Sequence, residues 1–368
     1  MVYKRLLVLS NSNNYRIYFI KKVLFKGFFL CLQLMKIDFS FIIPVYNRPD
    51  EIDELLQSMS LWETSVPFEV VIVEDGSQVK CDQILKNYIE KLHISYYYKP
   101  NSGPGDSRNY GMSKAMGSYF IILDSDVIMP RHYLDEVYKE LQNNYVDFFG
   151  GPDAADQSFS NIQKSINFSM TSFITTGGIR GGKNNVNKYE PRSFNMGISK
   201  KAYQASGGFG RIHPGEDPDL SIRLDKLGYH SRLLPNAYVY HKRRISWSKF
   251  YKQVNKFGRV RPILNKWHPQ SAKITFWFPS LFIIGFIISL LLFVFNIHWP
   301  LLSYLTYLGV CFIASLLESK NFIVAFLSIA AVCIQFFGYG IGFLKSQIIL
   351  LMKKGRPEDI FPSLFFKE

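Results

Sequence analysis

Residues 117–127 read Gly-Ser-Tyr-Phe-Ile-Ile-Leu-Asp-Ser-Asp-Val. The run from Tyr119 to Leu123 is continuously apolar, which predicts a strand buried on both faces of a sheet. The run stops at two carboxylates one residue apart, Asp124 and Asp126. In open α/β sheets, ligands bind at the edge where strands end. Two close carboxylates suit a hard divalent cation that completes its shell with waters and phosphate oxygens. Taken alone, the tripeptide is also typical of a solvated turn.

Composition limits the classes of protein to consider. The chain has 368 residues, of which 48% are hydrophobic, with the apolar excess near its end. That length leaves room for one large domain of roughly 200–250 residues and a further part. The formal net charge of +14 indicates an anionic partner: nucleic acid, a membrane surface or a phosphorylated substrate. The four cysteines form no Cys-x-x-Cys pair, so we expect neither a zinc knuckle nor a disulfide framework.

From residue 37 onward, apolar runs alternate with helical patterns. Strands are predicted over 39–45, 68–73, 94–98 and 118–123, and helices from Pro49 onward and over 82–92 and 104–116. Strands separated by helices of this length pair in parallel through crossover connections. The expected fold class is therefore α/β, with a Rossmann-like, mostly parallel, doubly wound sheet.

Polar residues gather at the ends of three of these strands, in residues 44–48, 74–77 and 124–126. A carboxylate such as Asp75, followed by a flexible glycine, can accept hydrogen bonds from a base or a ribose. Between these ends lies the loop 101–111, Asn-Ser-Gly-Pro-Gly-Asp-Ser-Arg-Asn-Tyr-Gly. Its glycines allow close backbone approach, its helix start offers free N–H groups, and Arg108 can bind phosphate bidentately. A simple Gly-Pro turn capping a helix is the alternative for this loop.

These residues resemble the family 2 glycosyltransferases of GT-A fold. The match covers about 39–261 and consists of Pro-Val-Tyr-Asn, Val-Glu-Asp-Gly-Ser, Gly-x-x-x-Ser-Arg-Asn-x-Gly and Leu-Asp-Ser-Asp, in that order. The family usually has Ala where Ser107 stands. The resemblance implies that Asp124 and Asp126 bind Mg²⁺ or Mn²⁺ and that the donor is a nucleotide sugar, usually a UDP-sugar. The positions it assigns to donor binding are Pro44, Tyr46, Asn47, Glu74, Asp75, Gly103, Arg108, Asn109 and Asp124.

The second half of the chain supplies a candidate base. Glu216 and Asp217 precede Pro218 at a predicted helix start, where the positive end of the helix dipole keeps carboxylates ionised. The resemblance implies that Asp217, with Glu216 beside it, deprotonates the acceptor hydroxyl. Helix capping by Asp217 or Asp219 is the alternative. On the acceptor side the resemblance points to Asn195, Met196, His213 and Gln253.

Residues 242–273 contain ten Lys or Arg and no acid. Aromatic and apolar residues recur at helical spacing between Trp247 and Phe257, which predicts a helix with one aromatic and one basic face. Such a helix favours an anionic membrane leaflet. Nucleic acid is not expected as a partner, because no known nucleic-acid-binding module surrounds the segment. Processive family members carry Gln-x-x-Arg-Trp here, and Gln253-Val-Asn-Lys-Phe257 matches it only in part.

Three apolar runs follow, over 276–295, 299–317 and 322–344. Each is long enough for the roughly 30 Å hydrocarbon core of a bilayer. The basic segment before them predicts a multi-pass protein of the plasma membrane whose catalytic domain faces the cytoplasm. Three crossings would place the basic tail, 346–368, on the opposite side, so two and three crossings both stay open. The basic leader, 1–36, is expected to be dispensable, with a surface helix or a signal sequence as alternatives.

The sequence thus predicts a GT-A domain over 37–241, an interfacial segment over 242–273 and two to three transmembrane helices over 274–345. The expected activity is that of an inverting, metal-dependent glycosyltransferase acting on a lipid-linked or polysaccharide acceptor. A processive polysaccharide synthase and a non-catalytic nucleotide-sugar-binding module are the alternatives. A nucleotidyltransferase is disfavoured because no early Gly-Gly-x-Gly-x-Arg loop is present.

Overall fold

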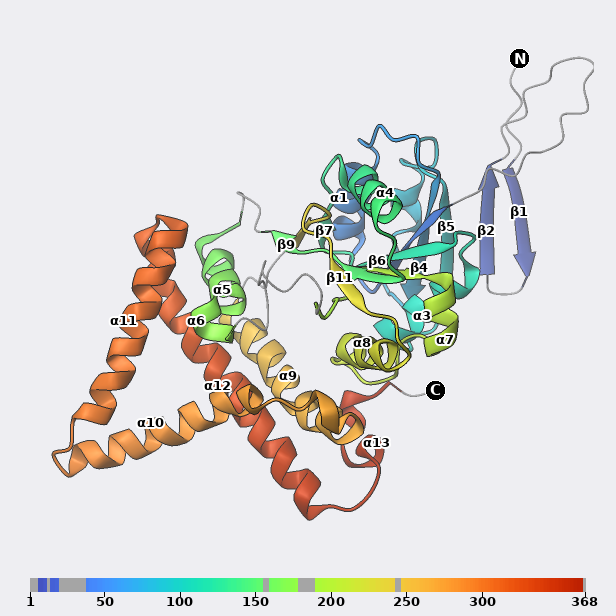
Figure 1. The fold of residues 1–368 in the computed structure, drawn as a ribbon. Helices are drawn as coiled ribbons and strands as arrows, with labels where there is room; N and C mark the ends of the chain where they lie inside the picture. The colour runs from blue at the N-terminus through green and yellow to red at the C-terminus, as the bar shows by residue number, and fades with distance from the viewer. Residues whose placement is uncertain are drawn as a thin grey trace, which may run out of the picture.

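The computed structural model describes residues 6–11, 14–19, 38–154, 159–177, 189–241 and 246–366 (Figure 1). Its centre is a seven-stranded sheet of order β11-β8-β10-β6-β3-β4-β5. The strands are β3 (Phe39–Val45), β4 (Phe68–Asp75), β5 (Ile94–Lys99), β6 (Tyr119–Leu123), β8 (Phe148–Gly150), β10 (Asn195–Ser199) and β11 (Ser231–Leu233). Only β10 runs antiparallel to its neighbours, so the predicted mostly parallel α/β sheet is confirmed.

The register aligns the strand ends that carry the polar motifs. Phe39 of β3 pairs with Phe68 of β4 on one side and with Tyr119 of β6 on the other. Because the three strands are parallel, the residues that follow each of them emerge at one edge of the sheet. The expected convergence of the three motifs follows from this pairing.

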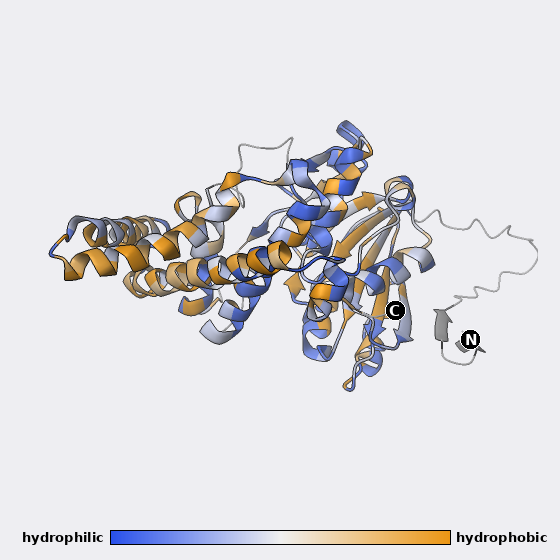
Figure 2. Ribbon diagram, turned by 90° about the horizontal axis from the view of Figure 1, so that it is seen from below, coloured by the Kyte–Doolittle hydropathy of each residue, from blue (hydrophilic) through white to orange (hydrophobic). Residues whose placement is uncertain are grey.

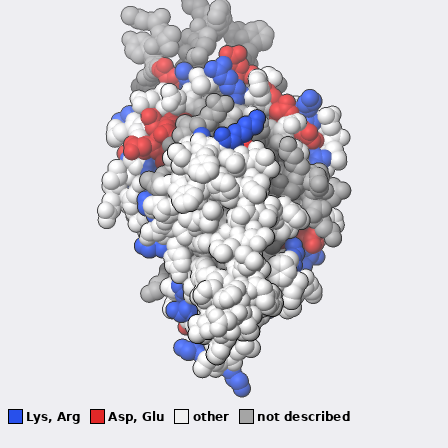
Figure 3. All heavy atoms as spheres, turned by 90° about the vertical axis from the view of Figure 1, so that its left-hand side faces the viewer, with Lys and Arg blue, Asp and Glu red and all other residues white. Residues whose placement is uncertain are grey.

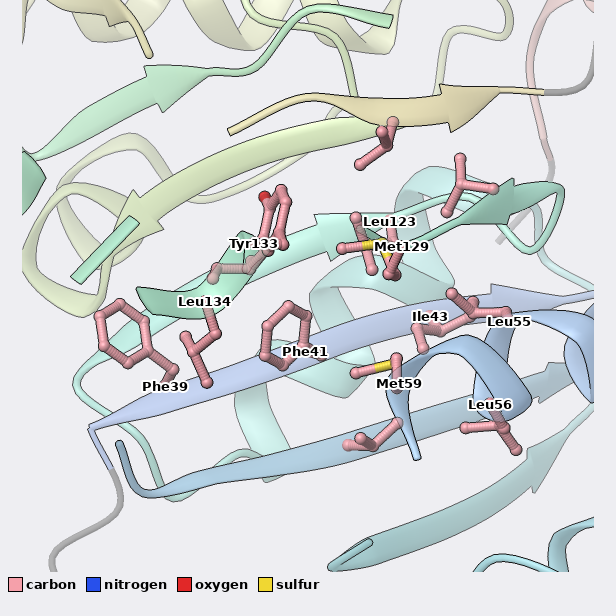
Figure 4. Close-up of a cluster of buried hydrophobic side chains, with 14 of the residues drawn as sticks. Phe39, Phe41, Ile43, Leu55, Leu56, Met59, Leu123, Met129, Tyr133 and Leu134 are labelled. Atoms are coloured by element: carbon pink, nitrogen blue, oxygen red, sulfur yellow. The ribbon is translucent and has the colours of Figure 1, made fainter. Parts of the chain in front are cut away.

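Helices cover both faces of the sheet. Successive side chains of a strand point to opposite faces, so a strand that is apolar throughout must be covered on both sides. Phe41 and Ile43 face one core, with α1 (Pro49–Met59) and α4 (Tyr133–Asn143), as Figure 4 shows. Ile42 faces a second core. The helices beside this second core are α3 (Pro104–Lys114), α7 (Lys200–Ser206) and α8 (Glu216–Lys226).

The helix predicted over 82–92 is wrong in length. Here α2 (Asp82–Leu85) makes a single turn, and isolated turns complete the connection to β5. Only Leu85 and Leu92 are buried in this stretch, so no continuous apolar face stabilises a longer helix.

Smaller elements flank the main sheet. Strands β7 (Val127–Ile128), β12 (Val239–His241) and β9 (Asp153–Ala154) form a second sheet, and α5 (Asn161–Thr171) and α6 (Phe173–Thr176) follow. Near the N-terminus, β1 (Leu6–Asn11) and β2 (Asn14–Phe19) form an antiparallel hairpin beside β5. The described part of the expected leader is therefore a hairpin rather than a helix. The rest of the leader lies outside the described residues.

The C-terminal part is helical and largely apolar (Figure 2). It comprises α9 (Trp247–Trp267), η1 (Pro269–Ser271), η2 (Ile274–Trp277), α10 (Phe278–Val294), α11 (Trp299–Ser319), α12 (Phe322–Met352), α13 (Pro357–Ile360) and η3 (Pro362–Leu364). Three segments, Ile274–Val294, α11 and α12, are long and apolar enough to cross a membrane.

Two details here differ from the sequence prediction. The apolar face of α9 does not face lipid, since Phe250 and Val254 pack with Ile166 and Met170 of α5 and Ala331 of α12. The helix predicted to end at residue 344 continues through Lys345 to Met352, so the first residues of the expected tail are helical. Helix α12 packs along α9, and α5 also contributes to the cover of its apolar face.

Candidate active site

The loops after β3 and β4 are tied together by Asn47. Its backbone lies in the left-handed region, with φ of 52°, and its N–H donates a 2.7 Å hydrogen bond to Ser77 Oγ. Its side-chain oxygen accepts from the N–H groups of Gln78, at 2.8 Å, and Val79, at 3.1 Å. Tyr46 next to it is half exposed and offers an aromatic face at the sheet edge, and Pro44 is the last residue but one of β3.

Glu74 is completely buried at the end of β4. Its carboxylate accepts hydrogen bonds from Ser77 Oγ, from the Cys81 N–H at 2.9 Å and from Tyr96 Oη at 3.3 Å. Burial first, and the Glu74 charge second, raise the pKa of the Tyr96 phenol and of the Cys81 thiol. Glu74 is therefore engaged in holding the turn after β4.

Asp75 likewise holds the loop before α3 through hydrogen bonds to its carboxylate. Its Oδ1 accepts from Ser102 N at 3.0 Å and from Lys99 Nζ at 2.6 Å, and its Oδ2 accepts from Gly103 N at 2.9 Å. Gly103 has φ of 96°, which favours glycine. Asp75 therefore orders the glycine-rich loop, and its contact with a nucleotide stays a prediction.

Arg108 lies at the centre of the site, with its side chain only 4% exposed. Its guanidinium is 2.7 Å from Asp124 Oδ1 and 3.1 Å from Glu216 Oε1, and 4.0 Å from Asp217 Oδ1. Burial lowers the pKa of Arg108, but the three surrounding carboxylates outweigh burial and raise it. A permanently charged side chain thus joins the loop after β6 to the start of α8.

The carboxylates proposed for metal binding each pair with an arginine. Asp126 Oδ2 accepts a 2.9 Å bond from Arg48, which also contacts Glu51 at 2.7 Å, while Asp124 pairs with Arg108. In the described residues, no group of three or more His, Cys, Asp or Glu side chains comes together as a metal cluster. Two oxygen donors without a thiol fit Mg²⁺ or Mn²⁺, which take further ligands from water and phosphate.

The start of α8 carries the candidate base. Asp217 Oδ2 accepts a 3.1 Å hydrogen bond from Ser193 N, while its buried Oδ1 has no hydrogen-bond partner among the described residues. Burial, and then the charge of Glu216, raise the pKa of Asp217 against the pull of Arg108. Burial also acts to raise the pKa of Glu216, but the charges of His213 and Arg108 outweigh it and lower that pKa. The two adjacent carboxyl groups therefore have pKa values shifted in opposite directions, with that of Asp217 raised and that of Glu216 lowered.

The capping alternative for this helix start does not hold. The residue before α8 is Gly215, and no side chain caps the helix. Asp219 is buried and instead accepts hydrogen bonds from Arg223 Nε at 3.0 Å and shares a 2.8 Å contact with His268 Nε2. Sequence reasoning missed His268, because its pairing with α8 depends on how α9 folds back.

The residues predicted for the acceptor side do not all lie at one site. His213 lies at the site, with Nδ1 at 3.0 Å from Glu216 Oε1. Asn195 and Met196 are completely buried, and the Asn195 amide accepts from Tyr133 Oη at 2.6 Å, so we leave both out of the proposed acceptor site. Among the described residues, no hydrogen bond joins Gln253 of α9 to α8.

Two further residues of this region brace the turn before α8. Asn109 of α3 donates to the carbonyl of Phe209 at 2.9 Å and accepts from its N–H at 2.8 Å. Phe366, near the chain's end, lies against Gly103, since a Cβ on that glycine would be 2.2 Å from its ring. A pocket between the start of α3 and residues 209–213 has Phe366 as one wall. No sequence signal pointed to Phe366.

The family described as "Glycosyl transferase family 2" matches residues 40–206. An uncharacterized glycosyltransferase of Rickettsia bellii is 35% identical over 105 residues, which are 28% of this chain and only 15% of that protein. A probable glycosyltransferase of Bacillus subtilis, YdaM, is 25% identical over 303 residues, covering 76% of this chain and 70% of the relative.

One solved structure resembles most of the chain. The mannosyltransferase PcManGT of Pyrobaculum calidifontis, in complex with GDP-Man and Mn²⁺, matches with a TM-score of 0.54 at 15% identity. The match covers 86% of this chain and 88% of the other, and at this identity it supports the fold alone. Residues 40–206 therefore match the family 2 glycosyl transferase model, and the sheet around them has a GT-A-like fold.

Proposed function

We propose that this protein is an inverting, metal-dependent glycosyltransferase. It moves a sugar from a nucleotide diphosphate donor, a UDP-sugar, to a lipid-linked or polysaccharide acceptor at a membrane. The observation that carries the proposal is the position of Arg108, which links the carboxylate of Asp124 to the first turn of α8, where Asp217 lies. Donor-side and acceptor-side groups are thereby held in one charged network.

The donor occupies the edge of the sheet where β3, β4 and β6 end. The half-exposed ring of Tyr46 stacks on the base, and the loops held by Asn47, Glu74 and Asp75 form the walls of its site. Asp124 and Asp126 hold Mg²⁺ or Mn²⁺, which when bound neutralises charge on the departing diphosphate. Arg108 adds a fixed positive charge on the same side.

Asp217 is the base. Ser193 fixes one carboxylate oxygen, and the other remains to accept the proton of the acceptor hydroxyl. The hydroxyl oxygen forms the new bond to the anomeric carbon as the bond from that carbon to the phosphate oxygen breaks. The diphosphate leaves with the electron pair, and attack from the opposite face inverts the anomeric centre.

A transfer assay on the full chain in membranes tests this proposal. A panel of UDP- and GDP-sugars is offered, and release of nucleoside diphosphate and sugar incorporation are both measured. We expect Asp217→Asn to lower turnover by about 10²–10⁴-fold with donor affinity unchanged. The matched control is Asp225→Asn, on the same helix but exposed, which should stay active. A wild-type chain that binds and turns over none of these donors would refute the proposal.

A further inference from the structure

The last described residues, 361–366, are docked on the catalytic domain. Phe365 forms an antiparallel bridge with Ile212, the His213 N–H donates to Leu364 O at 2.8 Å, and the Phe366 N–H donates to Arg211 O at 3.2 Å. A small core supports this pairing. It contains Ile212, Val260, Ile263, Leu264, Phe361 and Leu364. The segment after α12 therefore lies on the same side of any membrane as the domain that contains Asp217.

The long helix α12 also lies against this domain. Gly258 of α9 touches the backbone of α12, because a Cβ there would be 2.1 Å from Tyr339 O, and Asn255 Nδ2 donates to Gly338 O at 2.9 Å. Farther along, Ile349 packs beside Leu264. The two helices thus run side by side from about residue 331 of α12 to residue 350.

This packing prevents α12 from crossing a bilayer alone. Lys249, Lys252, Lys256 and Lys266 of α9 are exposed, and several charges on one helix are costly in hydrocarbon. Since α12 accompanies α9 from residue 331 onward, only 322–330 is free of it. That stretch is about 14 Å long, less than half of the roughly 30 Å core.

Unlike α9, the helices α10 and α11 are almost free of charged residues. Residues 274–317 contain no Asp, Glu, Lys or Arg, whereas Lys273 precedes them and Glu318 and Lys320 follow. Most of their large apolar side chains are exposed, among them Leu291, Phe293 and Leu317. In Figure 1 the two helices form a V that points away from the catalytic domain, with α12 across its open end. Figure 3 shows this face as a broad area free of charge, with Lys, Arg, Asp and Glu around its margin.

We infer that α10 and α11 form a hairpin that enters the lipid bilayer and returns to the side from which it came, while α12 lies along the membrane surface between the hairpin and the catalytic domain. The partner of the charge-free face is the hydrocarbon of the bilayer. The three apolar helices then contribute an even number of crossings, and both ends of the hairpin lie on the catalytic side.

Single cysteines and a membrane-impermeant maleimide test this topology in the full chain, after Cys31, Cys81, Cys311 and Cys333 are replaced by alanine. Asp225→Cys reports the side of the catalytic domain, Glu318→Cys the last turn of α11, and Lys354→Cys the residues after α12. All three positions are exposed, and folding of each variant is checked by its thermal unfolding midpoint.

The hairpin predicts that all three cysteines react from the same side, in sealed vesicles of one orientation and not in those of the other. Three successive crossings predict that Lys354→Cys reacts from the side opposite to Asp225→Cys, and this result would overturn the inference. Labelling of Glu318→Cys from the opposite side would overturn it as well, because α10 and α11 would then not return. A tag after residue 368, probed by antibody in the same vesicles, gives the second measurement if a cysteine variant does not fold.

Discussion

The N–H of Ser193 donates a 3.1 Å hydrogen bond to Oδ2 of Asp217, while the other carboxylate oxygen, Oδ1, lies 4.0 Å from the guanidinium of Arg108. Ser193 precedes β10, and Asp217 belongs to α8, so two separate elements define the direction of the base. A base must be oriented before its basicity matters. This hydrogen bond supports the proposal that Asp217, rather than Glu216, accepts the proton.

The first prediction concerns pH. Burial and the charge of Glu216 raise the pKa of Asp217 to about 6. Above this pH the carboxylate is ionised and accepts a proton, and below it the group is protonated and cannot. The turnover rate should therefore fall about tenfold for each pH unit below 6. Glu216 has a lowered pKa and does not titrate in this range. A rate that stays constant from pH 7 to pH 5 would contradict Asp217 as the base.

The second prediction concerns the metal. Asp126→Ala removes one of two proposed oxygen ligands, so turnover should fall at least about a hundredfold, which corresponds to about 2.7 kcal/mol of transition-state stabilisation. Binding of uridine diphosphate should weaken in Mn²⁺ but change little in chelator. Asp135→Ala, an exposed aspartate outside the site, is the control. Equal binding of uridine diphosphate to the wild type with and without chelator would exclude the metal bridge.

The third prediction concerns the end of the chain. The ring of Phe366 lies 5.8 Å from that of His213, which in turn contacts Glu216 at 3.0 Å. Removing this support in Phe366→Ala should lower kcat several-fold. Donor affinity should weaken as well, because Phe366 also lies against Gly103 of the loop that Asp75 holds. Phe366→Tyr should retain activity, since the ring is kept. Glu358→Ala, exposed in the same segment, is the control. If Phe366→Ala turns over at the wild-type rate, the tail does not position His213.

The sequence predicts well those parts of the site whose signal is local. The ends of β3, β4 and β6 carry their motifs directly after apolar runs, and α8 begins at Glu216 as its acids and Pro218 indicate. In each case periodicity and the residue at the boundary suffice.

Contacts between distant segments have no such signal. The bridge from Phe365 to Ile212 and the pairing of His268 with Asp219 depend on the path of α9 and α12, which no local pattern encodes. The apolar face of α9 shows the same limit. The spacing of its apolar residues predicts an amphipathic helix, but it does not show whether a membrane or other helices of the protein cover the apolar face. The structure supplies α5 and α12 as the partners.

The last prediction compares two His–Asp pairs that have similar N–O distances and differ in burial. His268 Nε2 is 2.8 Å from Asp219 Oδ1 with both side chains 9% exposed, whereas His230 Nδ1 is 2.9 Å from Asp225 Oδ1 with 77% and 71% exposed. In the buried pair, Lys226 Nζ lies 3.0 Å from His268 Nδ1. Since an ammonium group only donates, Nδ1 accepts and the Nε2–H donates to Asp219.

His268→Ala should therefore leave Asp219 partly unsatisfied in the interior and lower the free energy of unfolding by about 1–3 kcal/mol. Because Asp219 lies on α8 two residues after Asp217, turnover should fall as well. His268→Gln, whose amide can donate to Asp219, should recover part of both losses. His230→Ala should change neither, since exposed ion pairs contribute little. The measurements are the thermal unfolding midpoint and the transfer rate of the three variants. Equal effects of His268→Ala and His230→Ala would mean that the end of α9 does not hold the catalytic helix in place.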